Sequence, residues 1–112
     1  MENLNDHENK EELEELFKIL SNPNRLKIIH ILAENDNKEV TVNEISDKIK
    51  ITQPATSQHL KILKKSKIVQ CNKKGNNIYY KINVDTISHR KECVDSLFHK
   101  LLNTHLGVDT DD

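Results

Sequence analysis

The sequence predicts a mainly α-helical domain with one β-hairpin. Four helical segments precede the hairpin and one long helical segment follows it, which gives the order α-α-α-α-β-β-α. Two observations carry this prediction. Apolar residues recur at the spacing of a helix face outside residues 68–82, and strand-like runs flank a glycine turn inside that range. A length of 112 residues fits one domain with one modest core.

An apolar stripe and a stop signal predict the first two helices. The stripe has the spacing i, i+3, i+4, i+7 and consists of Leu13, Leu16, Phe17 and Leu20. Asn22 and Pro23 then end this helix and begin the next, because asparagine is a good helix cap and proline suits a first helical position. The second helix is apolar around much of its circumference, so we expect it in the core.

The third and fourth helices are short and close together in the chain. Thr41 and Glu44 have the spacing of a capping box, which predicts a helix start. Thr52 can cap the fourth helix, which tolerates Pro54 in its first turn and extends to about Lys65. A tight turn therefore joins the two helices.

A hairpin and a long helix complete the chain. Residues 68–73 and 77–82 are predicted strands, joined by a turn at Gly75, and the last helix is predicted over residues 86–105. Two short helices followed by a basic hairpin match the winged helix-turn-helix plan. We assign residues 10–105 to this domain and expect flexible ends at residues 1–9 and 106–112.

The charge of the chain is unevenly distributed. The net charge is −1, but residues 48–84 contain nine lysines and no acidic residue, so this segment carries +9. The remaining 8 basic and 18 acidic residues give −10. A one-sided basic segment creates a local field that attracts polyanions such as DNA. A solvated lysine surface is the alternative, and the absence of acidic residues makes it the weaker interpretation.

A helical wheel divides the fourth helix into two faces. The inner face contains Ala55, Thr56, His59, Leu60, Ile62 and Leu63. The outer face begins with neutral hydrogen-bonding groups and ends with lysines, in the order Gln53, Pro54, Ser57, Gln58, Lys61, Lys64 and Lys65. Such groups can contact base edges in the major groove and then phosphates. An ordinary amphipathic helix has the same pattern, but the neighbouring capped helix and basic hairpin favour DNA recognition.

The hairpin offers a second contact with DNA. Its tip carries polar and basic side chains, namely Lys73, Lys74, Asn76 and Asn77. These can contact the phosphate backbone or the minor groove and add salt-sensitive affinity. Of the neighbours Tyr79 and Tyr80, one is expected to pack inward, because adjacent strand residues face opposite ways.

Three stretches of the chain carry a family resemblance. They are Leu20-Ser21-Asn22-Pro23-Asn24-Arg25-Leu26-Lys27-Ile28, Gln53-Pro54-Ala55-Thr56-Ser57-Gln58-His59-Leu60-Lys61-Ile62-Leu63, and Gly75 with Ile78-Tyr79-Tyr80. Through these stretches, the chain resembles the ArsR/SmtB family of bacterial winged helix-turn-helix repressors. The resemblance covers roughly residues 10–105. The resemblance implies a homodimer formed by the first and last helices, an inverted-repeat operator, and release from DNA when an inducer binds.

The resemblance also adds Thr56 to the residues that contact DNA, whereas the wheel alone places Thr56 on the inner edge. The predicted DNA contacts are Gln53, Pro54, Thr56, Ser57, Gln58, Lys61, Lys64, Lys73, Lys74, Asn76 and Asn77. His59 is predicted to be structural. The apolar stripe of the last helix, with Phe17 and Leu20, exceeds what one protomer needs, which independently predicts a dimer.

The metal ligands implied by the resemblance are missing. The arsenic and cadmium type has a Cys-x-Cys pair where this chain has Thr41 and Asn43. The zinc, nickel and cobalt type has Asp-x-His and His-x-x-His on the last helix, at positions that here hold Val84, Thr86, Leu97 and Lys100. Neither established pattern carries over to this chain.

A shifted metal site remains an alternative. Asp85, His89 and His99 lie within an arc of about 80° on the last helix, and two antiparallel copies can bring them together. Their nitrogen and oxygen atoms suit a divalent metal such as zinc or nickel, with His7 or His105 as an accessory ligand. A polar face turned toward water explains the same residues, and we favour that interpretation.

The two cysteines are candidates for a redox switch. Cys71 is predicted to be half-buried in its strand, and Cys93 to flank the polar side of the last helix. They form no CxxC motif and are too few for a disulfide framework. Two inert thiols are the alternative, because sequence does not fix their separation.

Other function classes lack their signals. No apolar run is long enough to span a bilayer and no secretory signal is visible, so we expect a cytoplasmic protein. No Gly-rich phosphate loop, paired-carboxylate pocket or nucleophile elbow is present, so we do not expect an enzyme. The alternative to a DNA-binding repressor is a winged-helix protein-interaction module without a small-molecule inducer, which would use the acidic remainder of the chain.

Overall fold

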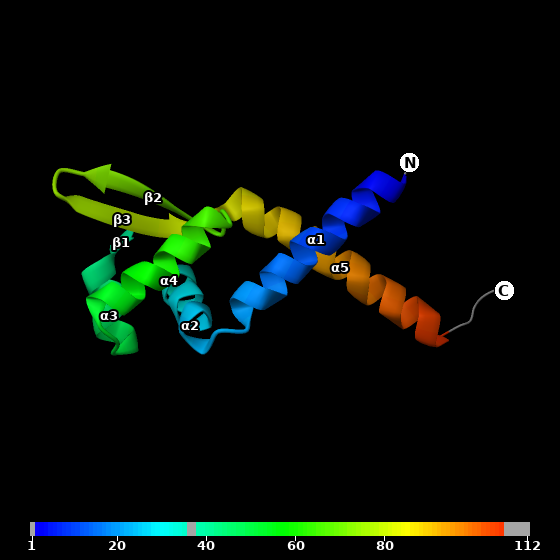
Figure 1. The fold of residues 1–112 in the computed structure, drawn as a ribbon, viewed down its shortest axis with the longest axis horizontal. Helices are drawn as coiled ribbons and strands as arrows, with labels where there is room; N and C mark the ends of the chain where they lie inside the picture. Colours follow the sequence, from blue (N-terminus) through cyan, green and yellow to red (C-terminus); the bar gives the residue numbers. More distant parts are fainter. Residues whose placement is uncertain (1, 36–37, 107–112) are drawn as a thin grey trace.

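The computed structural model describes residues 2–35 and 38–106, with side chains for residues 10–35 and 38–104. The elements follow the predicted order with one short strand added, as Figure 1 shows. They are α1 (Glu2–Leu20), α2 (Pro23–Glu34), β1 (Val40–Thr41), α3 (Val42–Ile49), α4 (Gln53–Lys65), β2 (Val69–Lys74), β3 (Asn77–Ile82) and α5 (Val84–Leu106). The winged helix-turn-helix prediction is confirmed.

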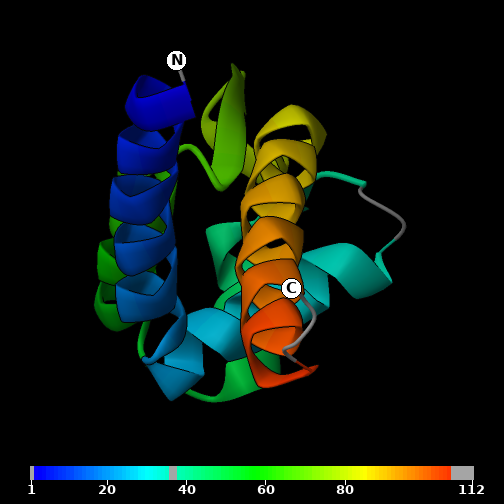
Figure 2. The same cartoon turned by 90° about the vertical axis from the view of Figure 1, so that its right-hand side faces the viewer.

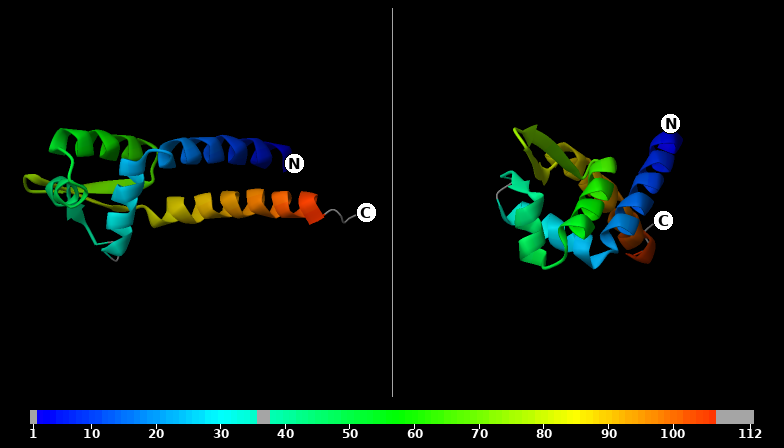
Figure 3. Two further views of the ribbon diagram at one scale, coloured as in Figure 1. Left: turned by 90° about the horizontal axis from the view of Figure 1, so that it is seen from below. Right: turned by 60° about the vertical axis from the view of Figure 1, so that its left-hand side comes forward.

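The molecule is elongated, with principal extents of 60 × 27 × 23 Å. The helices α2, α3 and α4 and the sheet form one end, from which α1 and α5 extend (Figures 1 and 3). These two long helices contact each other and run side by side, as Figure 2 shows. Within the described residues, no helix is long and apolar enough to cross a membrane.

The core lies where the first four helices meet the base of the hairpin. Its buried apolar residues are Leu16, Ile19, Ile28, Leu32, Val40, Ile45, Leu60, Leu63, Ile68 and Val69. Each of these four helices contributes one or two positions from a single face, as expected for amphipathic helices around one core. The helix α1 is turned relative to the predicted stripe: Leu16 and Ile19 are buried, whereas Phe17 is 46% exposed.

The predicted helix caps are confirmed. The Asn22 side chain accepts a hydrogen bond from the backbone N–H of Asn24 at 2.9 Å. In the capping box, the Glu44 N–H donates to Thr41 Oγ1 at 3.3 Å, and the Thr41 N–H donates to Glu44 Oε1 at 2.8 Å. These bonds satisfy N–H groups that have no partner within the helix and thereby fix where α2 and α3 begin.

The strand β1 extends the hairpin to a three-stranded antiparallel sheet with the order β1-β3-β2. Val40 pairs with Tyr80 and is buried, which ties the segment before α3 to the hairpin. Two residues are too few to show a strand period, so the sequence did not predict β1. The predicted turn is confirmed, because Gly75 adopts a φ of +63°.

Both ends of the chain differ from the prediction. The helix α1 begins at Glu2, because no glycine or proline interrupts residues 2–20, whereas the prediction relied on the apolar stripe alone. The helix α5 begins at Val84 rather than Thr86, since the Asn83 side chain accepts a hydrogen bond from the Thr86 N–H at 3.3 Å. Flexibility of residues 1–9 remains a prediction, and residues 107–112 of the predicted tail lie outside the described residues.

Adjacent residues of α4 should differ sharply in their contribution to stability. Leu60 is fully buried, so Leu60→Ala should lower the free energy of unfolding by about 2–5 kcal/mol. Lys61 is exposed, so Lys61→Ala should change it by less than about 0.5 kcal/mol. Urea denaturation followed by circular dichroism measures both values. Equal effects would contradict this orientation of α4.

Candidate nucleic-acid interface

The outer face of α4 is the centre of the candidate interface. The predicted contacts at its start and middle are exposed, namely Gln53, Pro54, Ser57, Gln58, Lys61 and Lys64. Leu60 and Leu63 on the opposite face are fully buried. Because the inner face is fixed in the core, the hydrogen-bonding groups and the lysines are held on one exposed surface. This surface has the chemistry expected for base and phosphate contacts.

The structure corrects two residues of α4. Thr56 was predicted to contact DNA, but its side chain is fully buried and its hydroxyl donates to the Thr52 carbonyl oxygen at 2.9 Å. Its hydroxyl is therefore used within the helix and does not face the surface. Ile62 was predicted on the inner face but is 36% exposed, since it lies at the edge of the buried stripe.

His59 is half-buried on the inner side of α4, as predicted. Burial lowers the pKa of His59, and the positive charge of Arg25 lowers it further. Among the described residues, His59 Nδ1 and Arg25 Nε are buried without a hydrogen-bond partner. The low pKa favours a neutral imidazole at neutral pH, so His59 is not a cationic phosphate contact.

The hairpin tip is exposed at Lys73, Lys74, Asn76 and Asn77, as its predicted role requires. Lys74, however, is paired with a carboxylate: its Nζ lies 2.7 Å from Glu39 Oε1 and 5.6 Å from the centre of the Tyr79 ring. The hydrogen bond with Lys74 lowers the pKa of Glu39, and the same bond raises the pKa of Lys74. One lysine of the basic hairpin is therefore paired with an acidic residue from outside the hairpin.

Sequence reasoning missed Glu39 because it lies outside the basic segment 48–84. Its neighbour Val40 pairs with Tyr80 in the sheet, and this pairing brings Glu39 to the hairpin. The Asn72 side chain also donates to Glu39 Oε2, at 3.5 Å. Tyr80 packs against the core, and burial raises its pKa, so it is the inward tyrosine of the pair.

Comparison with known proteins identifies the family of this fold. Residues 22–70, which include the helix-turn-helix, match the model of the bacterial regulatory proteins of the arsR family. The chain is 40% identical over 90 residues to an uncharacterised HTH-type transcriptional regulator of Methanocaldococcus jannaschii, covering 80% of this chain and 99% of the relative. The chain belongs to the ArsR family. Its members are transcriptional regulators, not enzymes.

One further relative of this ArsR-family chain is a repressor, and one solved structure has the same fold. It is 35% identical over 72 residues to the transcriptional repressor SdpR of Bacillus subtilis, covering 64% of this chain and 77% of that protein. The solution structure of a homodimeric winged helix-turn-helix DNA-binding domain from Mycobacterium bovis, a possible ArsR-family regulator, shares the fold. That match has a TM-score of 0.62 at 23% identity and covers 88% of each chain.

The predicted metal ligands of this ArsR-family chain do not meet within one protomer. His89 and His99 are ten residues apart on α5, which separates them by about 15 Å along the helix. His99 Nε2 lies 2.9 Å from the Asn103 side chain, whereas His89 Nε2 lies 2.7 Å from Glu12 Oε1. The approach of Asp85 and His89 to the partner's His99 in a dimer stays a prediction. The side chains of His7 and His105 lie outside the described ones.

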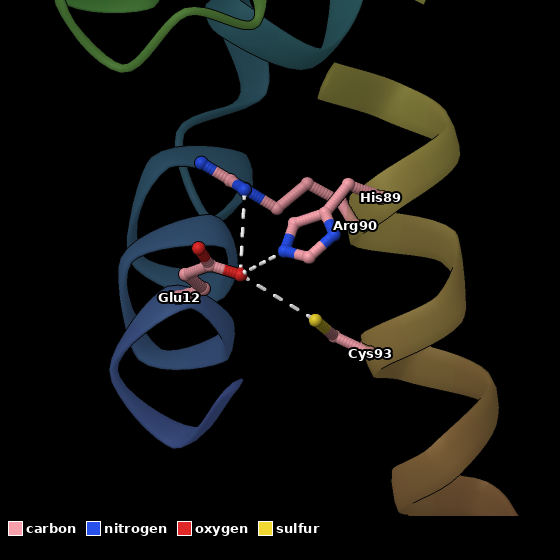
Figure 4. Close-up of polar contacts among 4 residues, drawn as sticks. All are labelled: Glu12, His89, Arg90 and Cys93. Carbon is pink, nitrogen blue, oxygen red and sulfur yellow. Dashed lines mark hydrogen bonds and ion pairs between the residues drawn. The ribbon is translucent and has the colours of Figure 1, made fainter. Parts of the chain in front are cut away.

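The two cysteines lie in different elements. Cys71 is half-buried in β2, as predicted. Cys93 is only 3% exposed, which corrects its predicted place on the polar side of α5. Its thiol points toward Glu12 of α1 (Figure 4). The Sγ atom lies 3.5 Å from Glu12 Oε1. Sequence periodicity could not reveal this contact, because Glu12 and Cys93 are 81 residues apart.

The half-buried His59 should make stability depend on pH. Its pKa is lowered in the fold, so the unfolded chain binds the proton more readily and stability falls as pH drops below about 6.5. His59→Gln lacks this loss. The free energy of unfolding of the variant should therefore improve relative to wild type between pH 7 and pH 5, as measured by urea denaturation. A constant difference across these pH values would argue against a neutral His59.

Proposed function

We propose that the chain is a homodimeric repressor that binds an inverted-repeat operator through α4 and the hairpin, and leaves DNA when an inducer binds. One observation carries the proposal: the exposed face of α4 presents neutral hydrogen-bonding groups first and lysines later, directly before an exposed basic hairpin. In this arrangement the first turn of α4 enters the major groove. As a regulator of transcription, the protein would act in the cytoplasm, in contact with DNA.

The proposed contacts divide into readers and anchors. Gln53, Ser57 and Gln58 can hydrogen-bond base edges, which carry the sequence information. Lys61 and Lys64 near the end of α4 are proposed phosphate contacts, with Lys73 and the hairpin asparagines adding contacts that do not depend on sequence. Pro54 would pack against the backbone at the start of the helix. Thr56 is not part of this proposal, because it is buried.

Exposed apolar residues on the long helices support the homodimer. Phe17 of α1 and Phe98, Leu101 and Leu102 of α5 are each 46–59% exposed. Large apolar side chains that are exposed on two neighbouring helices are candidates for an interface. A two-fold dimer through α1 and α5 would bury them and present two α4 helices to two half-sites of an operator. The related Mycobacterium bovis domain is described as homodimeric.

Repression follows from occupation of the operator, and the relative SdpR is described as a repressor. For the inducer we propose a divalent cation such as zinc or nickel. The low exposure of Cys93 argues against a thiol-reactive inducer that acts at this residue, because reactive cysteines are accessible and have a lowered pKa. The pKa of Cys93 is instead raised, chiefly by burial and also by its bond to Glu12.

Two substitutions in α4 test the division into readers and anchors. Gln53→Ala should reduce the preference for the operator over random duplex by about 1–3 kcal/mol, because it removes a base contact. Lys61→Ala should weaken binding to every duplex alike and lower the salt slope by about 1. Fluorescence anisotropy at several salt concentrations measures both effects.

The same titrations include a direct test of the proposed function. Wild type should bind an inverted repeat from upstream of its own gene as a dimer, with affinity falling steeply as salt increases. Absence of any preference over random duplex would exclude the repressor. If a protein partner were captured by wild type and also by the Ser57→Ala and Lys61→Ala variants, that result would support the alternative, a winged-helix protein-interaction module.

Removal of the carboxylate of Glu39, the acidic partner of Lys74, should strengthen DNA binding. Glu39→Gln frees Lys74 for a phosphate, so affinity for any duplex should rise and the salt slope should steepen by up to about 1. Glu14→Gln, at an exposed position of α1, is the matched control for the change in net charge. An equal rise in both variants would show that Lys74 is not restrained by Glu39.

A further inference from the structure

Three potential metal ligands from α1 and α5 converge at the contact of the two long helices. The ligand atoms of Glu12, His89 and Cys93 all lie within 4.8 Å of one another. Glu12 Oε1 is the point where the contacts meet (Figure 4). It lies 2.7 Å from His89 Nε2 and 3.5 Å from Cys93 Sγ. His89 and Cys93 are four residues apart, so they lie on one face of α5 that is turned toward α1.

We propose that Glu12, His89 and Cys93 form a binding site for a divalent cation of the zinc class, which joins α1 to α5 within one protomer. This site differs from both patterns that the sequence was compared with, since neither Thr41 and Asn43 nor the family positions on the last helix take part. It also needs no residue from a second copy of the chain, unlike a site built from Asp85, His89 and His99.

The ligand chemistry selects the class of cation. One thiol sulfur, one imidazole nitrogen and one carboxylate oxygen form a mixed set that suits zinc, whereas magnesium and calcium prefer oxygen ligands alone. Bonds of about 2.0–2.3 Å place tetrahedral ligand atoms roughly 3.3–3.6 Å apart. The sulfur–oxygen distance of 3.5 Å already matches, and the nitrogen–oxygen distance of 2.7 Å needs to widen by less than about 1 Å.

The surroundings allow the ion to enter and orient one ligand. The side chains of His89 and Glu12 are 50% and 32% exposed, so the cluster is open to solvent on the side of the imidazole. Arg90, whose side chain is 13% exposed, lies 3.5 Å from Glu12 Oε1. His89 and Cys93 approach this same oxygen, so the Glu12 carboxylate has to rotate for Arg90 to hold one oxygen while the other faces the ion, as outer ligand partners do in metal sites. Three protein ligands leave one position for water.

Cobalt binding to the full-length, reduced protein tests the site without DNA. Co²⁺ occupies zinc-type sites, and a cobalt–thiolate bond gives a charge-transfer absorption in the near ultraviolet. Wild type should bind a single Co²⁺ per chain with this absorption, and Zn²⁺ should displace it. No thiolate absorption in the wild-type titration would overturn the proposal, whether or not the protein binds an operator.

Matched variants assign the ligands. Cys93→Ser should abolish the charge-transfer absorption, whereas Cys71→Ser should keep it. His89→Gln and Glu12→Gln should each weaken Co²⁺ binding by at least about tenfold. Even a residue that only hydrogen-bonds to a metal ligand costs about that much affinity when it is replaced. His99→Gln should leave it unchanged, which separates this site from the one that includes His99. Absorption that persists in Cys93→Ser, or unchanged affinity in His89→Gln, would overturn the assignment. The His89 side chain is 50% exposed, so His89→Gln is the variant least expected to disturb folding.

Discussion

The burial of one face of α4 determines what the opposite face can do. Thr56, Leu60 and Leu63 are fully buried in a core shared with α2 and α3. Their spacing of three and four residues fixes the rotation of the helix about its own axis. Ser57 and Lys61, each one position further along, must then point away from the core. The readers and anchors are thus held in place by side chains that never contact DNA.

The same core also sets the position of the hairpin. Ile68 and Val69, shortly after α4, are buried. Asn83 follows β3, and its N–H donates to the Ile68 carbonyl oxygen at 2.9 Å. The hairpin is therefore fixed at its base and exposed at its tip. Its charge depends on a contact from elsewhere, because β1 places Glu39 beside Lys74. A count of lysines alone overstates the number that are available to phosphates.

Features encoded by neighbouring residues were predictable from sequence, and features encoded by distant pairs were not. The cap at Asn22, the capping box at Thr41 and the turn at Gly75 involve residues at most three positions apart, so their patterns are visible in the chain. The contacts Glu39–Lys74 and Glu12–Cys93 join residues 35 and 81 positions apart. Only the folded chain brings such residues together. The prediction that Thr56 contacts DNA was wrong, because it followed the family resemblance rather than the position of Thr56 on the helical wheel.

The contact between α1 and α5 connects the proposed cation site to the proposed DNA-binding surface. The helix α5 starts at the end of the hairpin, where Asn83 both bonds to Ile68 and caps α5 through Thr86. A shift of α5 against α1 must therefore move either the base of the hairpin or the exposed apolar residues Phe98 and Leu102 further along α5. A cation held by Glu12, His89 and Cys93 would bind differently to each relative position of these helices. That difference in affinity is what a ligand needs in order to shift the equilibrium between DNA-bound and released states.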